Sequence, residues 1–200
     1  MWVVKLGGSL GCDPMLPQWL DLLAQLGGGR VTVVCGGGAF AEEARHLQGY
    51  WQFDDLAAHN MAVLAMVQTA YQLNALNPGL RLAASLPEIR RVLDRGQTAL
   101  WQPFELQSQH AHKATNWSHT SDSIALELAC QLNAERLVVV KSCAIDAGLS
   151  LAHQRLTGVL DSGFAALSAE VAFPISLLHK ADLAGMRALL LDGARCNAIQ

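Results

Sequence analysis

Residues 3–9 read VVKLGGS and residues 31–38 read VTVVCGGG. Each stretch begins with a short run of mostly apolar, β-branched residues and ends in glycines. Continuous apolar runs, rather than alternating ones, are typical of strands that are buried on both faces of a parallel sheet. The glycines that follow predict tight turns directly after the strands. These two stretches therefore predict an α/β fold with a parallel core.

The chain continues as an alternation of helical and strand-like segments up to residue 141. The helical segments carry apolar residues at three- and four-residue spacing, and several of them end at glycine. The expected helices cover residues 17–26, 39–47, 54–76, 87–94 and about 121–132, and the further strands cover residues 80–84, 98–101 and 137–141. The polar segment 107–120 predicts a loop. We therefore expect one domain over residues 1–200, a three-layer αβα sandwich around a mainly parallel central sheet.

The composition is that of one globular domain. The chain has 200 residues, of which 52% are hydrophobic and 16% are charged. This length suffices for one core and is too short for two ordinary domains, and the balance excludes a disordered tail or a coiled coil. The net charge of −3, without a basic cluster, argues against nucleic acid as a partner.

The sequence also argues against membrane insertion and secretion. The first residues lack the basic region of a signal peptide. Segment 56–80 is free of charges and long enough to span a bilayer, but its His, Asn and Gln residues favour a buried helix of a soluble protein. The five cysteines are never spaced C-x-x-C, which argues against a disulfide framework or a zinc site. We therefore expect a cytoplasmic protein without a membrane partner.

Three polar or glycine-rich junctions follow the expected strands. They are Lys5 with Gly7-Gly8-Ser9, then Gly36-Gly37-Gly38, and Lys141-Ser142. Ligands of such sheets bind beyond the carboxyl ends of the strands. Glycines there let backbone N–H groups approach an anion, and a lysine adds positive charge. Each junction taken alone is also consistent with a tight turn or a solvated lysine. The sequence lacks the G-x-x-x-x-G-K-[ST] and G-x-G-x-x-G patterns, which disfavours a P-loop enzyme or a dinucleotide dehydrogenase.

Residues 115–125 read TNWSHTSDSIA and form the second candidate cluster. Ser121 or Asp122 is expected to cap the following helix. Asp122 could also position lysines around a transferring phosphoryl group, a reaction that depends mostly on alignment and cationic charge. The seven histidines show no convincing metal-binding spacing. His59, on the long expected helix, either faces a substrate or is a core histidine.

Three motifs occur in one order: VKLGGS at 4–9, VVCGGGAF at 33–40 and TSDSIA at 120–125. Together they resemble the amino acid kinase superfamily, which includes acetylglutamate, aspartate, carbamate and uridylate kinases. The strings DLAAHNMA at 55–62 and NWSHTSDSIA at 116–125 look like a small archaeal and methylotroph branch. Its characterised type phosphorylates (5-(aminomethyl)furan-3-yl)methyl phosphate in methanofuran synthesis. The resemblance covers the chain well up to Lys141, but the Asp-x-Asp-Gly that many relatives carry after this strand is missing.

The resemblance implies an ATP-dependent kinase with Mg²⁺, a small phosphorylated or carboxylated acceptor, and a homo-oligomer. It implies an acceptor-binding half at about 1–135 and a shortened nucleotide-binding half at about 136–200. The second catalytic lysine is Lys141 or Lys180, with Lys113 in the polar loop as an outsider. The alternatives are a uridylate or amino acid kinase of this superfamily, or a non-catalytic nucleotide- or oxyanion-binding module. The resemblance implies catalytic roles for Lys5, Asp122 and Lys141. It implies that the nucleotide is bound by Gly7, Gly8, Ser9, Lys141 and Ser142, and that the acceptor is bound by Gly36, Gly37, Gly38, His59, Trp117 and Thr120. No residue is expected to be a metal ligand.

Overall fold

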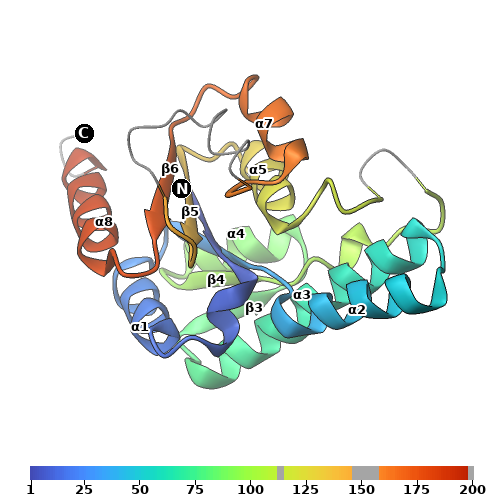
Figure 1. The fold of residues 1–200 in the computed structure, drawn as a ribbon. Coiled ribbons are helices and arrows are strands. Elements are labelled where there is room, and N and C mark those ends of the chain that lie inside the picture. Colours follow the sequence, from blue (N-terminus) through green and yellow to red (C-terminus); the bar gives the residue numbers. More distant parts are fainter. Residues whose placement is uncertain (112–114, 146–157, 198–200) are drawn as a thin grey trace.

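The computed structural model describes residues 1–111, 115–145 and 158–197. Their centre is a six-stranded sheet in the order β3-β4-β2-β1-β5-β6, and every pairing is parallel (Figure 1). The strands are β1 (Trp2–Leu6), β2 (Val31–Cys35), β3 (Leu80–Ala83), β4 (Thr98–Trp101), β5 (Arg136–Lys141) and β6 (Ile175–His179). The two central strands, β2 and β1, are fully buried, as their continuous apolar sequences predict.

Helices cover both faces of this sheet. One face packs against α1 and α8, and the other against α4, α5 and α7 (Figure 1). Helices α2 and α3 lie side by side. The carboxyl-terminal part of α3 packs against β3 and α1, with Ala70 and Leu73 in their core, and the rest of the pair extends away from the sheet. The helices are α1 (Leu16–Leu26), α2 (Gly38–Trp51), α3 (Asp55–Leu76), α4 (Leu86–Asp94), α5 (Ser121–Gln131), α7 (Ser162–Ser168) and α8 (Leu183–Asn197), with 3-10 turns η1 (Gly8–Cys12) and η2 (Phe104–Leu106). This is the expected α/β sandwich.

The side chains of β1 alternate between the two cores. Val4 and Leu6 pack on the side of α1 and α8, whereas Val3 packs on the side of α5. Lys5 follows Val3 by two residues, so it faces α5. The same alternation in β5 places Val139, and therefore Lys141, on the α5 side. The pleat of two neighbouring strands thus directs two lysines towards one helix.

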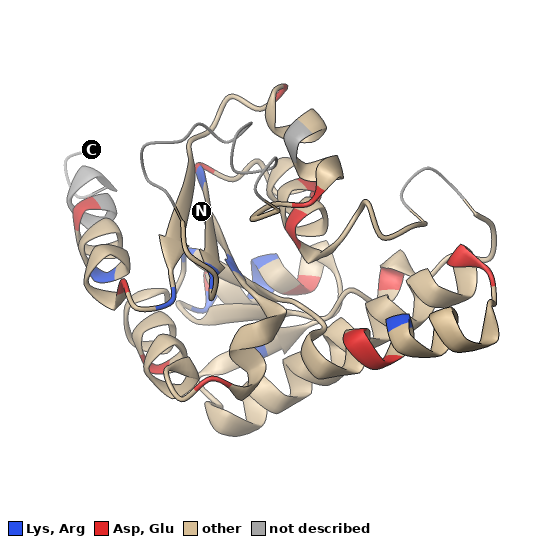
Figure 2. Cartoon of the chain, viewed as in Figure 1, with Lys and Arg blue, Asp and Glu red and all other residues tan. Residues whose placement is uncertain are grey.

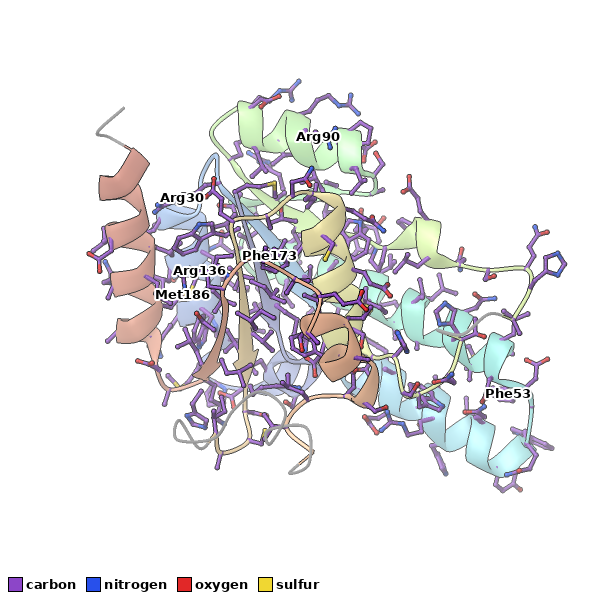
Figure 3. The ribbon with its side chains drawn as sticks, turned by 90° about the horizontal axis from the view of Figure 1, so that it is seen from above. Arg30, Phe53, Arg90, Arg136, Phe173 and Met186 are labelled. Carbon is purple, nitrogen blue, oxygen red and sulfur yellow. The ribbon has the colours of Figure 1, made fainter. Side chains whose placement is uncertain are left out.

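The opposite ends of the central strands are covered by cations. Arg30 precedes β2 and Arg136 begins β5, and the two arginines are labelled in Figure 3. Both guanidinium groups lie over the ring of Trp2, at 5.9 and 5.3 Å from its centroid. Such cation–π contacts contribute about 0.5–1 kcal/mol each at exposed sites. They lie at the end of the sheet away from the glycine-rich turns.

Helix α3 differs from the expectation of a buried helix. Its residues after Asp55 carry no charge, and the helix is tan along most of its length in Figure 2. One side packs inside, with Val63 and Leu73 almost inaccessible, but Leu64 and Tyr71 are 39% and 54% exposed. The absence of charge therefore reflects a helix that carries apolar and uncharged polar residues on all sides, only part of which is buried. Within the described residues, none of the helices meets the length and hydropathy needed to cross a bilayer.

The other predicted boundaries agree with the structure to within a few residues. Helix α2 extends to Trp51, four residues beyond the expected end, and the described part of segment 107–120 is irregular. The elements after residue 141, which are α7, β6 and α8, were not predicted.

Candidate functional site

Three charged side chains meet at the carboxyl ends of β1 and β5. Lys5 Nζ lies 2.6 Å from Asp122 Oδ1, and Lys141 Nζ donates to Asp122 Oδ2 at 2.5 Å. Lys5 comes from β1, Lys141 from β5 and Asp122 from the first turn of α5. Two strands and one helix therefore bring the three side chains together. The side chains of Lys5 and Asp122 are each 3% exposed and that of Lys141 is 16% exposed. We call these three residues the charge cluster.

Burial and charge act in opposite directions on the charge cluster. Burial lowers the pKa of Lys5 below the ordinary lysine value, and Asp122 only partly opposes this shift. Burial alone would raise the pKa of Asp122, but the charges of Lys5 and Lys141 outweigh it and hold the pKa below its usual range. Two ammonium groups and one carboxylate leave a net positive charge, which suits a site that binds phosphate.

The turn at Gly7 and Gly8 and the turn at Gly36, Gly37 and Gly38, which we call the two glycine turns, pack backbone against backbone beside the charge cluster. A Cβ on Gly8 would lie 2.5 Å from the nitrogen of Gly38, and one on Gly36 would lie 2.6 Å from the nitrogen of Gly8. Gly38 also has a φ of +54°, which a residue with a side chain adopts only with strain. Helix α2 begins at Gly38, so its amino end, where an anion is favoured, lies at these turns.

A cavity of about 470 Å³ opens above the charge cluster and the turns. Val63, Met66 and Ile124 add an apolar wall, and Glu42 and Arg45 add charge. Most of the predicted site residues come together in its lining: Lys5, Gly8, Ser9, Gly36, Gly37, Gly38, His59, Trp117, Thr120, Asp122 and Lys141. Gly7 and Ser142 lie outside the lining, although the hydroxyl groups of Ser142 and Ser9 are 2.5 Å apart.

Trp117 forms one wall of the cavity and is fixed by α2. Its Nε1 donates to Gln48 Oε1 at 2.6 Å, and the guanidinium of Arg45 lies 4.4 Å from its ring centroid. Sequence reasoning missed Arg45 and Gln48. The only signal in the sequence that could have indicated them is their spacing. Arg45 and Gln48 follow Gly38 by seven and ten positions, so they lie on the same side of the helix that begins at this turn.

His59 and Thr120 line the cavity but are also held by the protein. His59 Nε2 lies 3.1 Å from the carbonyl oxygen of Leu106, and the Thr120 hydroxyl donates to Asp161 at 2.6 Å. Thr120 is the N-cap of α5, one position before the cap predicted at Ser121 or Asp122. Both residues therefore shape the cavity as well as bordering it.

The sequence model of the amino acid kinase family matches residues 1–144. The chain belongs to this family. The chain is 23% identical over 141 residues to the [5-(aminomethyl)furan-3-yl]methyl phosphate kinase of Methanocaldococcus jannaschii. The match covers 70% of the present chain and 64% of the relative, so the chain spans less than two thirds of that relative's length.

Solved structures of UMP kinases share the fold of this amino acid kinase family member. The enzyme from Bacillus anthracis superposes with a TM-score of 0.70 at 16% identity, over 96% of this chain and 91% of that chain. The uridylate kinase from Archaeoglobus fulgidus gives 0.65 at 15% identity, over 94% and 95% of the two chains. The UMP kinase from Ureaplasma parvum gives 0.66 at 16% identity, over 89% and 88%. These likenesses confirm the predicted fold.

The structure describes the surroundings of two of the three lysines that were considered for the second catalytic position. Lys141 belongs to the charge cluster, whereas Lys180 Nζ pairs with Asp13 Oδ2 at 2.5 Å. Lys113 lies outside the described residues. Of the two lysines whose surroundings are described, Lys141 is therefore the one next to both Asp122 and the cavity.

Proposed function

We propose that this chain is an ATP-dependent kinase of a small phosphorylated acceptor. The observation that carries the proposal is the charge cluster, in which Lys5 and Lys141 flank Asp122 at the floor of a cavity bordered by two glycine turns. Phosphoryl transfer requires alignment and stabilisation of negative charge, with little covalent chemistry by the protein. The net positive charge of the cluster is of the sign that this reaction needs.

In the proposed reaction, an oxygen of the acceptor phosphate forms a bond to the γ-phosphorus of ATP. The bond from that phosphorus to the β,γ-bridging oxygen breaks, and ADP leaves with the electron pair. A phosphate monoester has a second pKa near 6, so it is largely dianionic at neutral pH and needs no general base. Asp122 is not placed to act as a base, because each of its oxygens faces an ammonium group. Its proposed role is to orient both lysines.

The described part of the chain provides no cluster of side chains that would hold a metal ion. Among the residues that the structure describes, no group of three or more His, Cys, Asp or Glu side chains is arranged to hold an ion. The carboxylate of the charge cluster is already shared by two lysines. We therefore propose that Mg²⁺ arrives with the nucleotide, bound by phosphate oxygens. The nucleotide would approach from the side of Ser9, Lys141 and Ser142.

For the acceptor we propose (5-(aminomethyl)furan-3-yl)methyl phosphate, converted to its diphosphate in methanofuran-type cofactor synthesis. The Methanocaldococcus relative is named for this substrate, and the flat wall of Trp117 suits an aromatic ring. The turn of Gly36, Gly37 and Gly38 at the start of α2 would hold the acceptor phosphate. A second candidate acceptor is UMP, because the similar solved structures are UMP kinases.

Release of ADP from Mg-ATP tests the proposal when acceptors are offered one at a time. The panel contains the aminomethylfuran phosphate, UMP, aspartate and acetylglutamate. Selective turnover of the furan phosphate supports the proposal in full, and selective turnover of another acceptor keeps the kinase and discards this substrate. Nucleotide binding without turnover of any acceptor would refute catalysis and favour a non-catalytic binding module.

We also propose that the chain forms a homo-oligomer through the exposed side of α3. Leu64 and Tyr71 are seven positions apart, so they lie on the same side of this helix, and they are 39% and 54% exposed. Large exposed apolar side chains on one surface are typical of protein contacts. Light scattering coupled to size exclusion tests this, and a mass near the chain's 21.5 kDa at micromolar concentration would refute it.

A further inference from the structure

Asp161 joins the last third of the chain to the first turn of α5. Its Oδ2 accepts from the Thr120 nitrogen at 3.0 Å, from the Thr120 hydroxyl at 2.6 Å and from the Ser123 nitrogen at 3.1 Å. Its Oδ1 accepts from the Ser123 hydroxyl and from the nitrogen of Phe164 at 2.8 Å. One carboxylate thus receives five hydrogen bonds.

These bonds exceed what a helix cap needs. An ordinary capping side chain accepts from one or two N–H groups of the helix that it begins. Asp161 does this for α7 through Phe164, and it also binds both sides of Asp122, at Thr120 and at Ser123. The Thr120 hydroxyl donates to Asp161 and lies 3.5 Å from the nitrogen of Asp122, from which it accepts. The carboxylate therefore fixes the backbone that carries Asp122.

The surrounding packing holds Asp161 in this position. The nitrogen of Gly163 donates to the carbonyl oxygen of Ser118 at 2.9 Å. A Cβ on Gly163 would lie 2.7 Å from a carbon of the His119 ring, so the two segments touch with no room for a side chain. Phe164 is fully buried. The segment that carries Asp161 is thus docked by a backbone bond and a buried ring.

We propose that Asp161 is a positioning residue for phosphoryl transfer: it holds the first turn of α5 so that Asp122 meets Lys5 and Lys141 at once. The inference rests on the proposed function. The positions of both lysines are set by strands, whereas that of Asp122 depends on the start of a helix, where the backbone has fewer hydrogen bonds. A displacement of about 1 Å in an aligned site costs about 100-fold in rate.

Asp161 also contributes charge. The charges of Asp122, Lys141 and Asp161 all act on Lys5, that of Asp161 least. The two carboxylates favour its ammonium form, whereas burial and Lys141 oppose it. Removing the charge of Asp161 would therefore lower the pKa of Lys5 further. A residue with a purely structural role would not change this pKa through its charge.

The test is Asp161→Asn, compared with Asp182→Asn. The asparagine keeps the shape but has only one accepting oxygen for five donors. Asp182 is a matched control, because it also accepts a helix-start hydrogen bond, from the Gly185 nitrogen at 2.9 Å, but it directly precedes α8 rather than α7. For Asp161→Asn we expect kcat to fall about 10- to 100-fold, the KM values to stay within about twofold, and the basic limb of the kcat profile to move to lower pH. For Asp182→Asn we expect wild-type kinetics.

Ser123→Ala keeps the inference falsifiable if Asp161→Asn does not fold. This variant loses one hydroxyl donor to Asp161 and keeps the charge, so kcat should fall several-fold with the basic limb unmoved. A folded Asp161→Asn with wild-type kcat and pH profile, or a Ser123→Ala with wild-type kcat, would overturn the inference and leave the proposed function intact. A wild-type chain that transfers no phosphoryl group to any acceptor would overturn both.

Discussion

Replacing Asp122 by Asn should separate the stabilising role of this residue from its role in the reaction. The amide has nearly the same shape as the carboxylate but carries no charge. Lys5, which is 3% exposed, and Lys141, which is 16% exposed, would then face each other without a counter-charge. Lys141 can turn towards water, whereas Lys5 is enclosed by β1 and α5.

The cost follows from this burial. Removing one partner of a buried ion pair destabilises a protein by about 3–5 kcal/mol, because the other charge stays buried and unpaired. For a domain of this size, each kcal/mol lowers Tm by about 2–4 °C, so we expect Asp122→Asn to lower Tm by about 6–20 °C. We also expect kcat to fall by about two to three orders of magnitude, as when a preorganised charge-stabilising group is lost.

The double variant Lys5→Met/Asp122→Leu provides the decisive comparison. Apolar residues of similar volume often replace a buried ion pair without loss of stability. The double variant should therefore recover most of the Tm lost in Asp122→Asn and remain inactive. Glu43→Gln is the surface control, because the pair of Glu43 with His46 is exposed and 3.8 Å long, which predicts a change below about 1 kcal/mol. Thermal unfolding and steady-state kinetics measure both quantities. An Asp122→Asn variant as stable as the surface control would refute the reasoning.

Three further predictions concern the proposed reaction. Lys141→Ala should lower kcat by about two to three orders of magnitude, whereas Lys180→Ala should leave it within about threefold; equal losses would contradict the assignment of the second lysine. Because burial lowers the pKa of Lys5, and only the protonated amine stabilises the transferring group, kcat should decline with rising pH below the range in which free lysine titrates; a profile that stays flat up to that range would argue against it. Trp117→Ala should raise the acceptor KM by about tenfold while ATP KM stays unchanged, and an unchanged acceptor KM would remove this wall from the acceptor site.

The first two thirds of the fold could be predicted because local signals and packing agree there. The strands β1 and β2 are buried on both faces and end in glycines that the close approach of the two turns requires. The last third gives weaker signals. Strand β6 lies at the edge of the sheet and all of its residues are only half-buried, and α7 has seven residues, too few for helical periodicity to stand out.

The charge cluster could be anticipated, whereas the residues that support it could not. Lys5, Asp122 and Lys141 each adjoin a strand end or a helix start, and such positions meet at one edge of a parallel sheet. Asp161 follows Asp122 by 39 positions, and its five hydrogen bonds depend on how α7 docks on α5. The guanidinium of Arg45 on α2 lies over the ring of Trp117, which comes from a loop 72 positions later in the chain. Such contacts are set by tertiary packing and leave no local pattern in the sequence.

The division of labour in the proposed site is consistent with the different acceptors after which the similar proteins are named. The proposed transfer centre is built by β1, β5 and the start of α5, and it supplies charge without a base. It therefore suits any acceptor that arrives already ionised, whether phosphate or carboxylate. Apart from Ile124 on α5, the walls that would contact the rest of the acceptor come from other elements: Val63 and Met66 from α3, and Trp117 from the loop fixed to α2. Changes in those walls alter the shape of the cavity without touching the charge cluster, so acceptor choice can change while the chemistry is retained.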